Sequence, residues 1–231
     1  MSIACPSLIG EHYPQLCMAV DHYCERTGPG FDAEPVNALS NVAFLLAAGA
    51  VWRLQMSHPP KQRARLVRAL TVTIVLVGLG SFLFHTVATR WAEWADVLPI
   101  LLFMLLYFWL TLTVFFGWTD WRKLAALLAY GATTLSIEGA IPPRFLWGGA
   151  LYLPTVFVMA AVTMALSGKR RPAGRGMLVA IVVFLSSFAA RTLDVPLCHD
   201  LPLGTHFLWH LLNAGLLYLL VRVVLLHGSA R

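Results

Sequence analysis

The chain has 231 residues, of which 58% are hydrophobic and only 12% are charged, and its mean hydropathy is positive. A soluble domain of this length cannot bury so large an apolar fraction in one core, so the composition excludes a soluble enzyme and predicts a membrane protein. The length leaves room for one domain, which covers residues 1–231.

Seven predominantly apolar segments follow one another along the chain, each long enough to cross about 30 Å of hydrocarbon as a helix. The predicted fold is all-α, an integral membrane bundle of seven transmembrane helices preceded by an N-terminal segment at 1–35. Glycine, threonine and serine dilute the fourth segment. The predicted spans are residues 36–56, 67–89, 95–117, 122–138, 146–167, 176–193 and 206–226.

Basic residues predict the orientation of the bundle. Thirteen of the 17 lie in or beside the loops after the first, third and fifth spans, or at the end of the chain. The positive-inside rule places these loops and the C-terminus in the cytoplasm, and the N-terminus with segment 1–35 outside. In a bacterial host this means the inner membrane, with the outer side facing the periplasm. Because the net charge of +6 is spread over loops at a membrane surface, it predicts no nucleic-acid partner.

Polar side chains interrupt the apolar segments near their predicted outer ends. Ser81 and His85 lie four residues apart in the second span, Asp96 opens the third, and His206 and His210 share one face of the last. Ionisable groups at membrane depth are costly and mark functional sites. Three imidazoles with one open position are the ligand set of catalytic zinc, so the histidines predict a zinc site. The first span begins at the same depth with Asn37, Ser40 and Asn41.

Other interpretations of these residues stay open. Each histidine alone is compatible with a hydrogen-bonded core residue, and Ser81 with a bond to the carbonyl four residues earlier. Haem needs ligands on opposite faces of its iron, which His85 could provide together with His206 or His210. A heptahelical receptor or structural membrane protein could use zinc only to brace its helices, although structural zinc sites are normally closed by four protein ligands.

Three motifs resemble those of the alkaline ceramidases, in the wider superfamily of seven-helix metal hydrolases that also contains the adiponectin-receptor-like proteins. The first is CERTGPGFDAEPVNALSN at 24–41, a Cys-Glu pair followed by Ala-Glu-x-x-Asn-x-x-Ser-Asn. The second, GSFLFHTVATRWAEWADVLP at 80–99, contains Ser-x-x-x-His with an aspartate eleven residues after the histidine, and the third, DVPLCHDLPLGTHFLWH at 194–210, ends in His-x-x-x-His. Their order and spacing are similar to those of a bacterial-type family member.

The resemblance implies a zinc-dependent membrane amidase that hydrolyses the amide bond of ceramide or a related N-acyl lipid to a fatty acid and a long-chain amine. His85, His206 and His210 would hold the zinc ion. Asp96 would orient and deprotonate the attacking water, and Ser81 would donate a hydrogen bond to the oxyanion. The expected partners are the lipid substrate and the membrane. Nothing in these residues separates ceramide from another lipid amide or ester.

The resemblance also implies a calcium site, built by the N-terminal segment against the zinc site. The family's asparagine after the Cys-Glu pair is replaced by Arg26 and Thr27, and the loop between the two glutamates is shorter. Calcium favours several oxygen ligands, which an acidic loop can supply; a solvated acidic loop is the alternative. Glu25 and Glu34 align with two carboxylate ligands, the Tyr23 carbonyl could occupy a backbone position, and Asp21 lies one residue away from the family's first aspartate.

A disulfide between Cys24 and Cys198 is a further implication of the resemblance. It would tie the N-terminal segment to the loop before the last span, on the predicted outer side of the membrane, where disulfides persist. Cys5 and Cys17 could form a second bridge, although a sequence does not establish connectivity.

Overall fold

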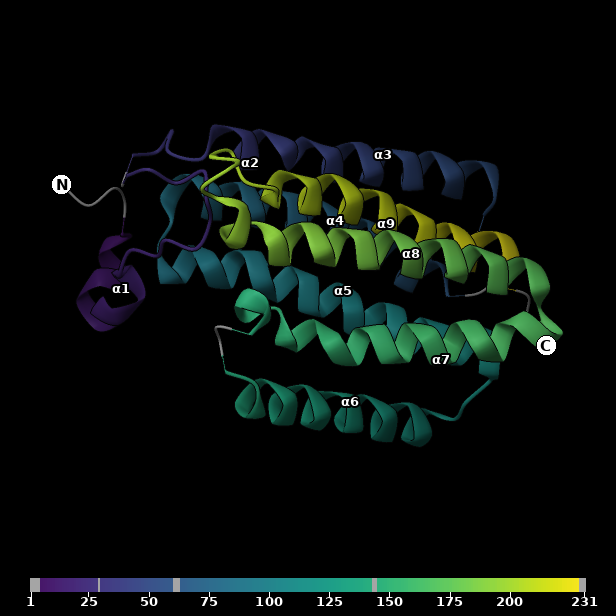
Figure 1. The fold of residues 1–231 in the computed structure, drawn as a ribbon. Helices are drawn as coiled ribbons and strands as arrows, with labels where there is room; N and C mark the ends of the chain where they lie inside the picture. The colour runs from purple at the N-terminus through teal and green to yellow at the C-terminus, as the bar shows by residue number, and fades with distance from the viewer. Residues whose placement is uncertain (1–4, 29, 60–62, 143–144, 229–231) are drawn as a thin grey trace.

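Seven long helical segments run side by side through the molecule (Figure 1). The computed structural model describes residues 5–28, 30–59, 63–142 and 145–228, and no β-strand forms within these ranges. A short helix, α1 (Ser7–His12), lies at the N-terminal end. The long segments are α2 (Pro35–Ser40) continuing into α3 (Val42–Ser57), α4 (Ala64–Val87), α5 (Arg90–Phe116), α6 (Asp120–Ala140), α7 (Leu153–Lys169), α8 (Arg171–Leu193) and α9 (His206–His227).

Six of the seven segments are long and apolar enough to cross a membrane: α2 with α3, α4, α5, α7 with the turn before it, α8 and α9. They mark the chain as a multi-pass membrane protein and match the predicted spans to within a few residues, apart from the first helical turns of α5 and α8 and the start of α7. The remaining segment, α6, is the diluted fourth span, and it does not reach the same hydropathy. It lies alongside α7 at the edge of the bundle (Figure 1).

Apolar side chains occupy both the centre and the outside of the bundle. Leu70 and Leu110 are completely buried, whereas Leu46, Leu135 and Phe157 are 71%, 71% and 67% exposed. A helix that is apolar on every face fits a bilayer, where lipid tails cover the outward side chains. The packing therefore agrees with the membrane location that the composition predicts.

The N-terminal segment is tied to the turn between α4 and α5. Ala88 ends α4 in the left-handed region, with φ at 45°, and Thr89 is extended before α5 begins. The N–H of Val20 donates to the Ala88 carbonyl at 2.9 Å, and the N–H of Arg90 donates to the Met18 carbonyl at 3.1 Å. This segment therefore covers one end of the bundle, opposite the end where the C-terminus lies (Figure 1).

Gly80 allows α4 and α5 to approach closely at this covered end. A Cβ atom at position 80 would collide with the carbonyl oxygen of Ala95 and would lie 3.3 Å from Cα of Asp96. Only glycine permits this contact between the two backbones. The contact brings the start of α5, which carries Asp96, beside the turn of α4 that carries Ser81.

Asp194 holds the start of α9 against the N-terminal segment. Its Oδ1 atom accepts the backbone N–H groups of Thr205 and His206 at 2.6 and 2.8 Å, and its Oδ2 atom accepts the N–H of Cys24 at 2.9 Å. A carboxylate at this position satisfies N–H groups that a helix leaves unpaired at its first turn. Gly204, with φ at 67°, leaves room for the carboxylate, because a Cβ there would collide with Oδ1.

Two disulfides link parts of the extramembrane region. One joins Cys24 to Cys198, the pairing that the resemblance implies, and the other joins Cys5 to Cys17. Together with Asp194, the first bridge attaches the N-terminal segment to the α8–α9 connection.

Candidate metal centre

Three histidines from two helices meet below the N-terminal segment. His85 comes from the last turns of α4, and His206 and His210 come from the first turns of α9. Each offers a ring nitrogen, these nitrogens all lie within 4.8 Å of one another, and the three residues are at most 2% exposed. Across the part of the chain that the structure describes, this is the one such group of histidine, cysteine and acidic side chains.

Hydrogen bonds hold two of the imidazoles in a defined tautomer. Nδ1 of His85 lies 2.6 Å from a carboxylate oxygen of Glu34, which can only accept, so His85 donates there. Nδ1 of His210 lies 2.7 Å from Oγ of Ser40, and that hydroxyl donates its single proton to the Asn37 carbonyl. Ser40 therefore accepts from His210. Both rings keep a lone pair on Nε2, the arrangement that a metal ligand needs.

The donor set fits a transition-metal ion. The Nε2 atoms of His85 and His210 are 3.2 Å apart, and Nδ1 of His206 is buried with no hydrogen-bond partner among the described residues. A neutral three-nitrogen set of this kind suits zinc and similar ions. The Tyr23 ring stacks on His206 with ring centroids 3.6 Å apart and limits how that imidazole can turn. Three ring nitrogens that all lie within 4.8 Å of one another favour a single small ion over a haem, whose iron takes two ligands from opposite faces.

Ser81 and Asp96 lie beside the three imidazoles. Oγ of Ser81 is 3.3 Å from Nε2 of His210. The carboxyl group of Asp96 interacts with Ser81 and His85, and its Oδ1 atom is buried without a hydrogen-bond partner in the described ranges. A carboxylate with free hydrogen-bonding capacity next to a metal-ligand set is placed to hold and deprotonate a water molecule.

Two of the residues aligned with calcium ligands make bonds within the chain instead. The carboxylate of Glu25 accepts the N–H groups of Val36 and Asn37 at 2.6 and 2.8 Å, which satisfies the first turn of α2. The Tyr23 carbonyl accepts the N–H of Arg26 at 3.2 Å. Both residues therefore shape the N-terminal segment.

Glu34 and Asp21 do not form an acidic pair either. Glu34 is 2% exposed and contacts His85, Asn37 and the guanidinium of Arg26, whereas Asp21 lies exposed at the surface. Burial raises the pKa of the Glu34 carboxyl, but the hydrogen bond from His85, the charge of Arg26 and the hydrogen bond from Asn37 outweigh it, so the pKa lies below its ordinary value. The calcium ligands expected from the resemblance do not gather as a second metal cluster in the residues described.

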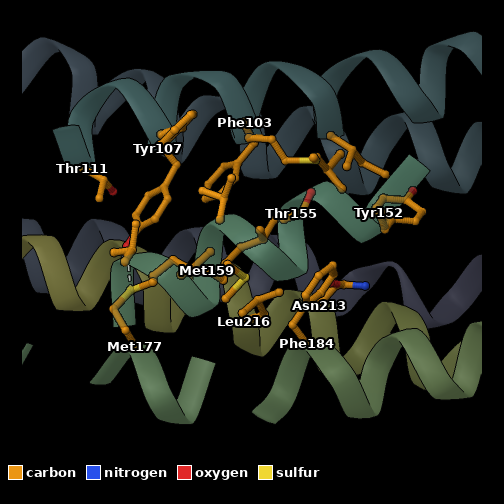
Figure 2. A pocket seen from close by; sticks show the side chains of 18 of the residues that line it. Phe103, Tyr107, Thr111, Tyr152, Thr155, Met159, Met177, Phe184, Asn213 and Leu216 are labelled. Carbon is orange, nitrogen blue, oxygen red and sulfur yellow. Dashed lines mark hydrogen bonds between the residues drawn. The ribbon is translucent and has the colours of Figure 1, made fainter. Parts of the chain in front are cut away.

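An apolar cavity lies inside the bundle, near the metal centre (Figure 2). Its wall includes Phe44, whose ring centroid is 6.4 Å from that of His210, and Trp209, the residue before that histidine. Further along, side chains from four helices point into the same space: Phe103 and Tyr107 of α5, Met159 of α7, Met177 of α8 and Leu216 of α9. The lining of the cavity is almost entirely apolar, which suits a hydrocarbon group.

The model of one protein family, described as Ceramidase, matches residues 23–229. The chain belongs to the Ceramidase family. No individual curated protein matches it. The matched region contains the three histidines, Ser81 and Asp96. Membership in the Ceramidase family implies a membrane hydrolase that acts on amide bonds.

Several residues of this Ceramidase family member take part in the site although their roles were not predicted from the sequence. Ser40 orients His210, the Tyr23 ring packs on His206, Arg26 binds Glu34, and Asp194 caps the helix that carries two of the histidines. For Ser40 the sequence offered a signal, because it lies at the start of the first span, at the same predicted depth as the histidines. The other three contacts depend on the path of loops, which spacing along the sequence does not reveal.

Proposed function

We propose that this chain is a zinc-dependent membrane amidase that hydrolyses ceramide or a related N-acyl lipid to a fatty acid and a long-chain amine. The observation that carries the proposal is the group of three buried imidazoles whose ring nitrogens lie within 4.8 Å of one another, beside Ser81 and Asp96. Its occurrence in a member of the Ceramidase family supports amide hydrolysis over a purely structural metal site.

His85, His206 and His210 are the proposed zinc ligands. Zinc held there supplies a Lewis acid for the carbonyl oxygen and lowers the pKa of bound water to about 7. Glu34 and Ser40 keep two of the imidazoles in the ligating tautomer. Three protein ligands leave a coordination position for solvent, as catalytic zinc sites do.

Asp96 carries out the proton transfers, and Ser81 stabilises the negative charge that develops on the carbonyl oxygen. Asp96 accepts a proton from the attacking water while the water oxygen forms a bond to the amide carbon. Ser81 donates a hydrogen bond to the carbonyl oxygen as negative charge develops on it. Asp96 then passes the proton to the amide nitrogen, the C–N bond breaks, and the products are a carboxylic acid and an amine.

The cavity is proposed to bind one hydrocarbon chain of the lipid. Its apolar wall lies between α5, α7, α8 and α9 and includes Phe44, which contacts His210, so a chain inserted there would have its amide group towards the metal centre. Burial of a hydrocarbon chain contributes about 0.8 kcal/mol for each methylene group, which favours long-chain substrates.

The proposed topology has seven spans, with α6 as the fourth, and places the site on the extracytoplasmic side. Basic residues are concentrated in the connections at the end opposite the N-terminal segment, including Arg63, Arg122 and Arg171. By the positive-inside rule that end faces the cytoplasm together with the C-terminus. In a bacterial cell the active site would open towards the periplasm.

The proposal is tested with purified protein in detergent and a fluorescently labelled ceramide. Removal of metal with a chelator should abolish release of the fatty acid, and added zinc should restore it. Asp96→Asn should lose turnover while retaining one metal per chain, and His206→Ala should lose the metal itself. Product formation that persists after complete metal removal would exclude the mechanism. Lipid profiling of membranes incubated with wild-type and Asp96→Asn protein would reveal a different N-acyl substrate.

A further inference from the structure

A permanent positive charge is buried next to the metal centre. Arg26 is 9% exposed and lies beneath the N-terminal segment. Its Nε atom donates to the Glu34 carboxylate, Nη1 donates to the Gly28 carbonyl at 3.1 Å, and Nη2 donates to the His85 carbonyl at 2.9 Å. The guanidinium thus donates hydrogen bonds to one carboxylate oxygen and two backbone carbonyl oxygens. These are the kinds of oxygen that surround calcium in proteins.

The donor set that the resemblance assigns to calcium does not fit that ion here. Both carboxylate oxygens of Glu25 accept N–H groups of α2, the Tyr23 carbonyl accepts the N–H of Arg26, and Asp21 is exposed. The remaining carboxylate, on Glu34, already accepts hydrogen bonds from three side chains, Arg26, His85 and Asn37. A calcium ion would have to displace hydrogen bonds that the chain makes to itself.

A buried carboxylate needs a compensating charge, because burial without one is strongly destabilising. The guanidinium of arginine remains protonated at all accessible pH values and presents its donors in a fixed planar fork. Arg26 is therefore able to neutralise Glu34 without any soluble ion. It also fixes the backbone of His85 through the carbonyl contact at 2.9 Å.

We propose that Arg26 replaces a calcium ion in this enzyme: its guanidinium holds Glu34, and Glu34 in turn orients the metal ligand His85. Arg26 is a positioning residue, since it acts through Glu34 and not on the substrate. The consequence is an amidase whose metal centre is independent of calcium. The link to zinc binding rests on the proposed function, whereas the independence from calcium does not.

Calcium binding is tested directly on the wild-type protein in detergent. The melting temperature of the zinc-loaded protein is measured in calcium-depleted buffer and again after addition of millimolar calcium, and calcium binding is measured by titration calorimetry. The expected result is the same melting temperature in both buffers and no binding heat. Calcium that raises the melting temperature, or that binds at one site per chain, would overturn the proposal whatever the substrate proves to be.

The role of Arg26 is tested by Arg26→Gln and Arg26→Lys, with zinc affinity measured by competition against a chromogenic chelator. Loss of a group that supports a metal ligand typically weakens metal binding by about 10- to 100-fold. Arg26→Gln should show this loss of zinc affinity. Arg26→Lys keeps the positive charge but not the planar fork of donors, so its loss of zinc affinity should be smaller. Leu166→Ala, a buried position of α7 outside the cavity, is the control that lowers the melting temperature without changing zinc affinity. Unchanged zinc affinity in folded Arg26→Gln would refute the positioning role.

Discussion

Nδ1 of His85 lies 2.6 Å from Oε2 of Glu34, and the side chains of these two residues are 0% and 2% exposed. When a histidine binds a metal through one ring nitrogen, a carboxylate that accepts the N–H of the other ring nitrogen fixes the orientation of the imidazole and makes it a stronger ligand. This contact connects the N-terminal segment to the metal centre, so substitution of Glu34 should change the affinity for the metal.

Glu34→Gln should weaken zinc binding by about 10- to 100-fold, because an amide is a poorer acceptor for the imidazole N–H. It should also lower the free energy of unfolding by about 3–5 kcal/mol, since the buried charge of Arg26 loses its partner. Chelator competition and thermal unfolding measure the two effects. Glu138→Gln, at an exposed position of α6, is the matched control and should change neither.

Ser81→Ala should lower kcat by about 10²- to 10³-fold, the usual cost of removing one oxyanion donor. The metal content should stay at one ion per chain, because the hydroxyl is not among the proposed ligands. Steady-state kinetics and elemental analysis on the same sample separate these quantities. Ser136→Ala removes a helical serine that is exposed on α6 and should retain full activity. A kcat within twofold of wild type for Ser81→Ala would remove Ser81 from the mechanism.

Asp194→Ala should destabilise the start of α9. The carboxylate caps the N–H groups of Thr205 and His206, and loss of a helix cap costs about 0.5–2 kcal/mol. Because His206 is the first residue of α9, zinc affinity should fall together with the melting temperature. Asp200→Ala, an exposed position of the same connection, should behave as wild type. Normal zinc affinity in Asp194→Ala would mean that the cap does not support the site.

Met159→Trp should shift the substrate preference towards shorter acyl chains, because the larger ring fills part of the cavity. Overpacking of this kind costs about 1–3 kcal/mol, which thermal unfolding will detect. Hydrolysis rates for a series of ceramides that differ only in chain length measure the preference. Phe157→Trp, on the outward face of α7 at 67% exposure, should leave the profile unchanged. The same profile in both variants would place the acyl chain elsewhere.

The sequence was informative where periodicity carries the signal. His206 and His210 are one helical turn apart, and the alternation of basic loops placed His85 at the same end of the bundle, so the metal cluster was predicted before any coordinates. The helix positions were predictable for the same reason, because apolar segments of about 20 residues have few alternatives in a bilayer. The span assigned to α6 stays a prediction, since threonine and glycine lower its hydropathy.

The supporting contacts were not predictable, because they join residues that are remote in sequence through loop geometry. Ser40 and His210 are 170 positions apart, and Arg26 and the His85 carbonyl are 59 apart. An arginine beside an acidic pair is equally compatible with a solvated loop, so its charge alone does not reveal that it is buried. Arg26 and Glu34 both belong to the N-terminal segment, and the path of that segment across the end of the bundle buries them beside His85.

The bridge between Cys24 and Cys198 spans 174 positions of the 231-residue sequence. In the proposed topology Cys24 reaches the outer side of the membrane early in biosynthesis, whereas Cys198 reaches it only after the helices that precede α9 have been inserted. The bridge can therefore hold the N-terminal segment over the histidines only after α8 has been made. A ribosome that stalls before α9, or a nonsense mutation there, leaves a nascent chain without His206 and His210, two of the three proposed metal ligands.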